Sequence, residues 1–169
     1  MRKSRYDLDE AQLKPYFELN KVLKDGVFYA ATRLYGITFK QRRDIPVYHP
    51  DVRTWEAVRE GRVIGLFYGD YFARPGKESG AWMSSFRDQQ TLNGDIIPIV
   101  TNNSNFSKSR PCLLSFDEAV TLFHEMGHAL TYVNFITQTE EDKHFKKEFK
   151  NFSKVARPIF EAMQYGQKN

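Results

Sequence analysis

The residues best suited to chemistry in this chain are two histidines and a glutamate in the segment His124-Glu125-Met126-Gly127-His128. Positions i and i+4 of an α-helix lie on the same face, about one turn apart. The imidazole nitrogens of His124 and His128 could therefore converge on one Zn²⁺ ion, at the usual Zn–N distance of about 2.0–2.1 Å. Glu125 would border that ion, where its carboxylate could accept a proton from an activated water. The spacing thus predicts a zinc site that activates water for hydrolysis.

A helix is expected to carry this segment. Ser115 and Glu118 have the spacing of a capping box, in which each side chain bonds the backbone amide of the other residue. Apolar residues then recur at helical spacing as far as Leu130, so the helix is predicted to run at least to Tyr132. The alternative interpretation is that the two histidines and the glutamate simply occupy a solvated helix face.

Further elements must position that helix. Residues 19–35 show apolar spacing typical of a helix, and Gly36 is expected to end it. Residues 52–58 and 63–68 alternate apolar and polar positions and are rich in β-formers, so they are predicted to form two strands joined by a tight turn.

The stretch after this hairpin is rich in glycine and is expected to be loop up to Met83. Residues 96–100 form a short predicted strand, and Pro98 suggests that it lies at a sheet edge, because proline cannot donate a ladder hydrogen bond. The polar residues 102–111 are predicted to be a loop.

Composition limits the class of protein. A chain of 169 residues that is 41% hydrophobic and 15% aromatic is not expected to be disordered, and one compact domain is the default. The net charge is +4, but acidic residues are interspersed among the basic ones, so no nucleic-acid partner is expected. The apolar runs are far shorter than the roughly 20 residues of a membrane span. The single cysteine and the absence of an N-terminal apolar stretch favour a cytoplasmic location.

Four motifs follow one another along the chain in a fixed order. They are Tyr48-His49-Pro50-Asp51-Val52-Arg53, Leu66-Phe67-Tyr68-Gly69-Asp70-Tyr71-Phe72-Ala73-Arg74, Gly80-Ala81-Trp82-Met83, and Leu122-Phe123-His124-Glu125-Met126-Gly127-His128-Ala129-Leu130. Over residues 6–130 the chain resembles the catalytic region of the M3 family of zinc metallopeptidases, in particular its peptidyl-dipeptidase and oligopeptidase A branch. The resemblance implies an α+β, mainly helical, zincin-like partial catalytic domain with a small β-sheet.

The resemblance also implies the roles of individual residues. His124 and His128 would be zinc ligands, and Glu125 would be the general base that hydrolyses oligopeptides in a deep channel. The remaining implied contacts are with the peptide substrate: an extended peptide would pair with the strand at Ile97 and Ile99, and Gly80, Ala81 and Trp82 would lie in the cleft wall.

After Leu130 the family pattern ends. The third zinc ligand of the family, a glutamate, falls on Ser153 of this chain. Glu148 is an alternative candidate for the third ligand, although it lies in a charged segment that could equally be an ordinary solvated helix face.

The departures divide the chain into two expected parts. Residues 1–131 are predicted to be a partial M3-like catalytic domain, and residues 132–169 a divergent helical tail. The chain is interpreted as a truncated or rearranged copy of the catalytic region. The alternatives are a non-catalytic remnant that binds zinc or peptides weakly at most, and a chain that needs a missing complementary chain.

Overall fold

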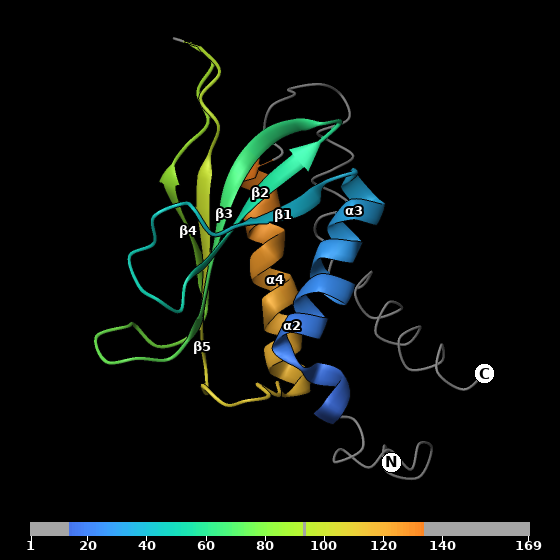
Figure 1. Ribbon diagram of the computed structural model, residues 1–169, viewed down its shortest axis with the longest axis vertical. Helices are drawn as coiled ribbons and strands as arrows, with labels where there is room; N and C mark the ends of the chain where they lie inside the picture. The colour runs from blue at the N-terminus through green and yellow to red at the C-terminus, as the bar shows by residue number, and fades with distance from the viewer. Residues whose placement is uncertain (1–13, 93, 134–169) are drawn as a thin grey trace, which may run out of the picture.

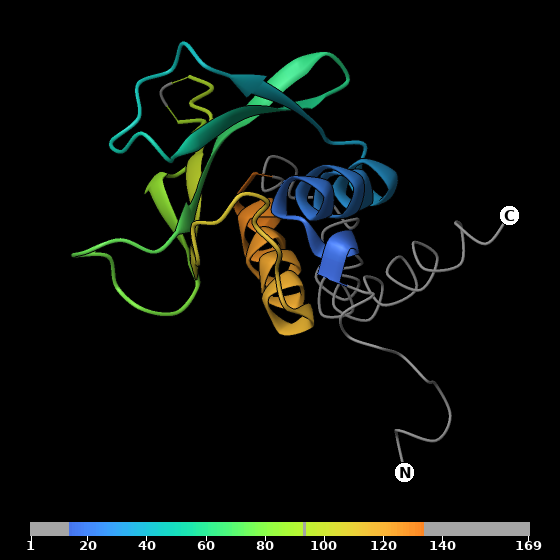
Figure 2. The ribbon, with the colours of Figure 1, turned by 60° about the horizontal axis from the view of Figure 1, so that its bottom comes forward.

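A computed structural model describes residues 14–92 and 94–133. In this part of the chain a five-stranded mixed sheet carries helices on one face (Figures 1 and 2). In chain order the elements are η1 (Lys14–Phe17), α2 (Leu19–Lys21), η2 (Val22–Phe28), α3 (Tyr29–Tyr35), β1 (Thr38–Arg42), β2 (Arg53–Arg59), β3 (Arg62–Phe72), β4 (Trp82–Arg87), β5 (Ile99–Phe106) and α4 (Phe116–Val133).

The fold is not mainly helical, so that part of the predicted fold class is wrong. Among the described residues, 32% are helical and 35% lie in strands. The sheet is larger than expected because the end of β3, the strand β4 and most of β5 lie in segments whose composition is typical of loops. Of the predicted tail, only Tyr132 and Val133 belong to the described residues, and both lie in α4. None of the helices in the described ranges is long and apolar enough to cross a membrane.

The predicted N-terminal helix is confirmed. The elements α2, η2 and α3 follow one another without a break over residues 19–35, and the middle section is π-helical. The Glu18 carboxylate caps the start by accepting a hydrogen bond from the amide of Lys21 at 3.0 Å. Gly36 ends the helix with φ 65°, a left-handed conformation that glycine adopts without steric cost.

The predicted hairpin is also confirmed, as β2 and β3. The turn places Glu60 at φ 51° and Gly61 at φ 77°, which matches the positive φ angles of a type I′ turn. Strand β3 continues to Phe72, beyond its predicted end at Tyr68. The strand order across the sheet is β1-β2-β3-β5-β4.

Two predictions about the segment that forms β5 are wrong. The segment from residue 102 was expected to begin a polar loop, but Asn102, Asn103 and Ser104 are buried inside β5. The strand was also expected at the sheet edge, but it pairs in parallel with β3 and antiparallel with β4. Pro98 is compatible with this internal place because it precedes the strand, and its carbonyl accepts a hydrogen bond from the amide of Leu66 at 2.9 Å. The sheet edge on this side is β4, a segment that was expected to be loop.

The core lies between the sheet and the helices. Phe28 stacks on Phe39 at a centroid distance of 4.2 Å and meets the edges of Trp55 and Phe67. Helix α4 adds a buried stripe of apolar side chains to this core: Ala119, Leu122, Phe123, Met126, Ala129, Leu130 and Val133. The stripe fixes which face of α4 is turned toward the sheet.

Replacing Gly69 by alanine is expected to destabilise the fold by about 1–3 kcal/mol, the usual cost of overpacking. A Cβ atom at Gly69 would lie 2.5 Å from three atoms of the Tyr71 side chain, which is fully buried and has little room to move. Urea denaturation measures the loss. Gly65→Ala is the matched control in β3, because its Cβ would lie 3.2 Å from the Val133 methyl groups and should cost less. Equal midpoints for Gly69→Ala and the unaltered chain would contradict the expectation.

Candidate functional site

Helix α4 begins with the predicted capping box. The amide of Ser115 donates to the Glu118 carboxylate at 2.7 Å, and the amide of Glu118 donates to the Ser115 hydroxyl at 3.1 Å. These two bonds satisfy amides that have no partner within the helix. Asp117 and Glu118 also place negative charge in the first turn, where the helix dipole favours it. The helix that carries the two histidines therefore has a fixed start.

The two histidines lie together on the exposed face of α4. The Nε2 atoms of His124 and His128 are 3.1 Å apart, and the rings meet edge to face with centroids 4.7 Å apart. Two nitrogens that bind one zinc tetrahedrally at about 2.05 Å would be about 3.3 Å apart. The observed separation is close to that value, so this donor pair fits a zinc ion.

Glu125 lies between the histidines and the buried stripe of α4, because His128 is its i+3 neighbour on the helix surface. It is only 7% exposed, and its neighbours on the helix surface, Leu122 and Ala129, are buried in the core. No hydrogen bond joins its carboxylate to another residue in the described part of the chain. The carboxylate is therefore available to accept a hydrogen bond.

The third metal ligand is not found in the described ranges. Within residues 14–92 and 94–133, no group of three His, Cys, Asp or Glu side chains is placed to hold a metal ion. Glu148, the candidate from the sequence, lies outside these ranges.

The residues expected to contact a peptide fall into two groups. Gly80 and Ala81 lead directly into β4, and Trp82 is its first residue, so this group lies at the open edge of the sheet. Ile99 pairs with neighbours on both sides in β5, and the carbonyl of Ile97 accepts a hydrogen bond from Arg87 Nε at 3.0 Å. In the described structure β4 lies along that side of β5, and the pairing of a peptide at Ile97 and Ile99 remains a prediction.

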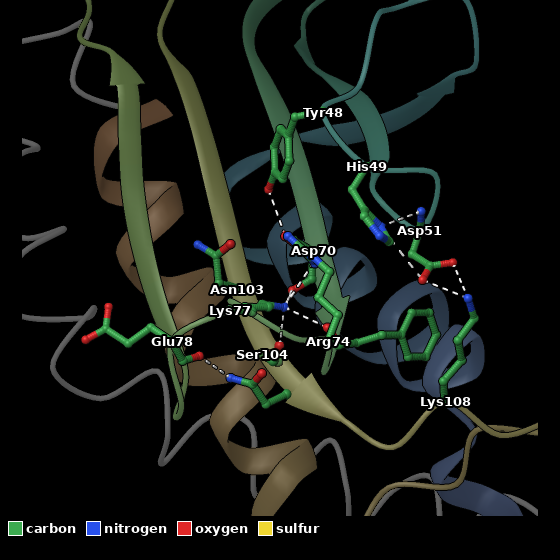
Figure 3. A network of polar contacts seen from close by, with 12 residues as sticks. Tyr48, His49, Asp51, Asp70, Arg74, Lys77, Glu78, Asn103, Ser104 and Lys108 are labelled. Atoms are coloured by element: carbon green, nitrogen blue, oxygen red, sulfur yellow. Dashed lines mark hydrogen bonds and ion pairs between the residues drawn. The ribbon is translucent and has the colours of Figure 1, made fainter.

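A buried ion network lies on the sheet face opposite the helices, and sequence reasoning did not identify it (Figure 3). Asp70 is 1% exposed. Its carboxylate accepts two hydrogen bonds from Arg74, at 2.6 and 2.7 Å, one from Lys77 at 3.0 Å and one from the Tyr48 hydroxyl at 3.0 Å. Burial alone would raise the pKa of Asp70, but the bonds from Arg74, Lys77 and Tyr48 outweigh it and hold the pKa below its ordinary value. The only signal in the sequence was the position of Tyr48, Asp70 and Arg74 inside the ordered motifs; Lys77 lies between two of them.

The network also fixes the chain that leads into β4. Lys77 Nζ donates to the carbonyls of Asp70 and Phe72, at 2.8 and 3.0 Å, and to the carbonyl of Ser104 in β5. The Asn105 side chain then donates to the carbonyls of Glu78 and Gly80, at 2.7 and 2.8 Å. Through these bonds β5 positions the segment that enters the edge strand.

Comparison of the sequence with known proteins finds a match to one family model and to several relatives that are peptidases. The family model of peptidase family M3 matches residues 1–148. Dipeptidyl carboxypeptidases from Salmonella typhimurium and Escherichia coli are each 54% identical to the chain over 134 residues, which cover 77% of the chain and 20% of each relative. Oligopeptidase A from Escherichia coli is 40% identical over 134 residues, covering 76% of the chain and 20% of that relative. The chain thus spans about a fifth of the length of the curated relatives it matches.

Proposed function

The chain belongs to peptidase family M3, a family of metallopeptidases, and on this basis we propose that residues 1–131 are part of the catalytic domain of a zinc-dependent peptidase that hydrolyses oligopeptides. The observation that carries the proposal is the 3.1 Å approach of the two Nε2 atoms on α4, next to a buried glutamate. Residues 132–169 are proposed to be a divergent tail.

The proposed mechanism assigns one role to each side chain. His124 and His128 would hold the zinc ion through Nε2. When bound, zinc would supply Lewis acidity and lower the pKa of an attacking water toward 7. The Glu125 carboxylate would accept a proton from that water and deliver it to the amine that leaves when the peptide bond breaks. Its lack of a hydrogen-bond donor in the described structure supports this role, since the carboxylate remains available as an acceptor.

The proposed position of the substrate is beside β4. Only one side of β4 is paired in the described structure, and α4 packs against both β5 and β4. An extended peptide could add to the free side by backbone hydrogen bonds, as in other complexes formed by β-augmentation. Trp82 begins this edge, so we propose that Gly80, Ala81 and Trp82 contact the peptide.

Zinc retention tests the proposal. We expect the purified chain to retain about one zinc per molecule after dialysis against a mild chelator, as a built metal site does. His128→Ala removes one of two ligands on α4 and should lose that zinc. His49→Ala is the matched control, because His49 lies beside Asp51 in a loop remote in sequence from α4. Elemental analysis of the three proteins measures the ratio.

The alternative is a non-catalytic remnant, favoured by the incomplete ligand set in the described ranges. Failure of the unaltered chain to retain zinc would favour this alternative, or a site completed by a second polypeptide. If zinc is retained, Glu148→Gln tests the third ligand: loss of zinc would assign it to Glu148, and retention would assign it elsewhere.

A further inference from the structure

Three buried polar side chains between the sheet and α4 have no hydrogen-bond partner within the described part of the chain. They are the Tyr71 hydroxyl, both side-chain atoms of the Asn102 amide, and the Ser104 hydroxyl. All three residues are at most 1% exposed. Buried polar groups in folded proteins are satisfied by protein atoms or by ordered water, because leaving one unsatisfied costs about 1–3 kcal/mol. This buried polar cluster therefore needs a further partner.

The cluster is built around a glycine. Gly69 in β3 is the register partner of Asn102 in β5. The Tyr71 ring covers Gly69 so closely that a Cβ atom there would lie 2.5 Å from the hydroxyl oxygen. Asn102 and Ser104 alternate with residues of the other face, and they share the helix-facing side with Val100, a core residue. The Tyr71 hydroxyl and the Asn102 amide thus lie over neighbouring backbone positions.

Glu125 lies at the same level on the facing helix. Helix α4 runs antiparallel to β5 (Figure 1), and near its end the Val133 methyl groups lie 3.2 Å from the Cβ position of Gly65. Glu125 comes eight residues earlier, which is about 12 Å along the helix. The same 12 Å corresponds to about 3–4 residues along a strand. Four residues after Gly65 in β3 comes Gly69, whose register partner in β5 is Asn102. Glu125 therefore lies at about the same height along α4 as these two residues do along the sheet.

We propose that an ordered water held by the Tyr71 hydroxyl and the Asn102 amide links the sheet to Glu125, so that Asn102 and Tyr71 are positioning residues for its carboxylate. An ionised carboxylate only accepts hydrogen bonds, and Glu125 has no donor in the described structure. The water would accept from Asn102 Nδ2 and donate to Glu125, and the Tyr71 hydroxyl would complete its partners. A buried water typically makes two to four such bonds. The role of Glu125 as base rests on the proposed function, whereas the water link does not.

A double-mutant cycle tests the link. Asn102→Leu and Glu125→Leu are made singly and together, and the folding equilibrium is measured by urea denaturation of metal-free protein in chelator. We expect Asn102→Leu to lower the equilibrium constant for folding about tenfold in the unaltered chain, which equals about 1.4 kcal/mol. In the Glu125→Leu background the loss should be less than threefold, because both ends of the link are then apolar. Equal losses in the two backgrounds, or a gain in stability from Asn102→Leu, would overturn the proposal.

Two further variants make the result specific. Tyr71→Phe removes one hydroxyl without changing the ring and should also couple to Glu125→Leu. Thr101→Val is the matched control, because Thr101 is equally buried but lies on the opposite face of β5, and its effect should add to that of Glu125→Leu. In a crystal structure, the link requires a water within hydrogen-bond distance of the Tyr71 hydroxyl and the Asn102 side chain.

The cycle is independent of the proposed enzymatic activity, because it uses neither zinc nor substrate. Coupling without peptide hydrolysis would support the link and argue against the enzyme. Additive effects in a chain that does hydrolyse peptides would reject the link and leave the enzyme in place.

Discussion

Peptide hydrolysis by the zinc-loaded chain is expected to fall about 10²–10⁴-fold when Glu125 is replaced by glutamine, which is the usual contribution of a positioned general base. Glutamine has nearly the same shape but cannot accept the proton of the attacking water. The fold should be retained, because the Glu125 carboxylate forms no ion pair within the described ranges. Initial rates with a fluorogenic oligopeptide, measured at matched zinc content, give the ratio.

The control for this experiment is Glu118→Gln on the same helix. Glu118 belongs to the capping box, so its replacement should affect the stability of α4 slightly and leave hydrolysis unchanged. Comparable rates for Glu125→Gln and the unaltered chain would show that Glu125 is not the base. A chain that retains zinc but does not cleave peptides would identify the remnant rather than the enzyme.

Replacing Asp70 by asparagine is expected to destabilise the fold by about 3–5 kcal/mol, the cost of removing one partner from a buried ion pair. The Lys77 side chain is 3% exposed and would be left with its charge but without a carboxylate. Asp51→Asn is the matched control, because Asp51 pairs with Lys108, whose side chain is 57% exposed, and such surface pairs contribute at most about 1 kcal/mol. Urea midpoints of the three proteins measure the difference. Similar losses of stability for Asp70→Asn and Asp51→Asn would contradict the expectation that burial of the ion pair sets the cost.

The same network predicts a dependence of stability on pH. The pKa of Asp70 is lower in the folded chain than its ordinary value, so the folded state favours the charged carboxylate. The resulting stabilisation is complete above the pKa of the unfolded carboxyl group, about 3.9, and is lost as the pH falls through the lower folded value. The difference in unfolding free energy between the unaltered chain and Asp70→Asn should therefore have its full value at pH 7 and become smaller as the pH falls below about 3.9. A gap that does not change down to about pH 2 would reject this account.

Local signals in the sequence predicted the elements whose stability is largely local. The capping box at Ser115 and Glu118 marks the start of α4, and Gly36 marks the end of the first helix. The tight turn at Gly61 joins the two strands of the hairpin as expected. In each case the signal depends on backbone conformation and on neighbours a few residues away, so no knowledge of tertiary contacts is needed.

The strand predicted at residues 96–100 covers only the start of β5 (Ile99–Phe106), and the rest of β5 was not predicted because its environment comes from the rest of the fold. Asn102 and Asn103 have low β-propensity, yet they form a central strand between β3 and β4, where tertiary contacts outweigh propensity. Pro98 suggested an edge, but a proline just before a strand removes no ladder hydrogen bond. Since the strand order places β4 outside β5, the sequence could not show which strand a peptide would meet.

The sequence indicated the candidate residues on α4 but not the Asp70 network, because only the former depend on local geometry. His124, Glu125 and His128 lie within five residues on one helix, so their relative placement follows from helix geometry alone. The Asp70 network joins residues of a strand, a loop and a neighbouring strand, and no spacing rule relates Tyr48 to Lys77. The burial of Glu125 beside Leu122 could be seen only once α4 was packed on the sheet.

The two outer strands of the sheet differ in charge. In the described structure β1 carries Lys40 and Arg42, and such charges discourage the pairing of another strand. Strand β4 carries no charge from Trp82 to Phe86, so its free backbone groups are unprotected. The feature that would let β4 take up a peptide also makes it the edge at which two copies of the chain would join. Self-association and peptide binding would then compete for the same hydrogen bonds, and a bound peptide would act as an inhibitor of aggregation.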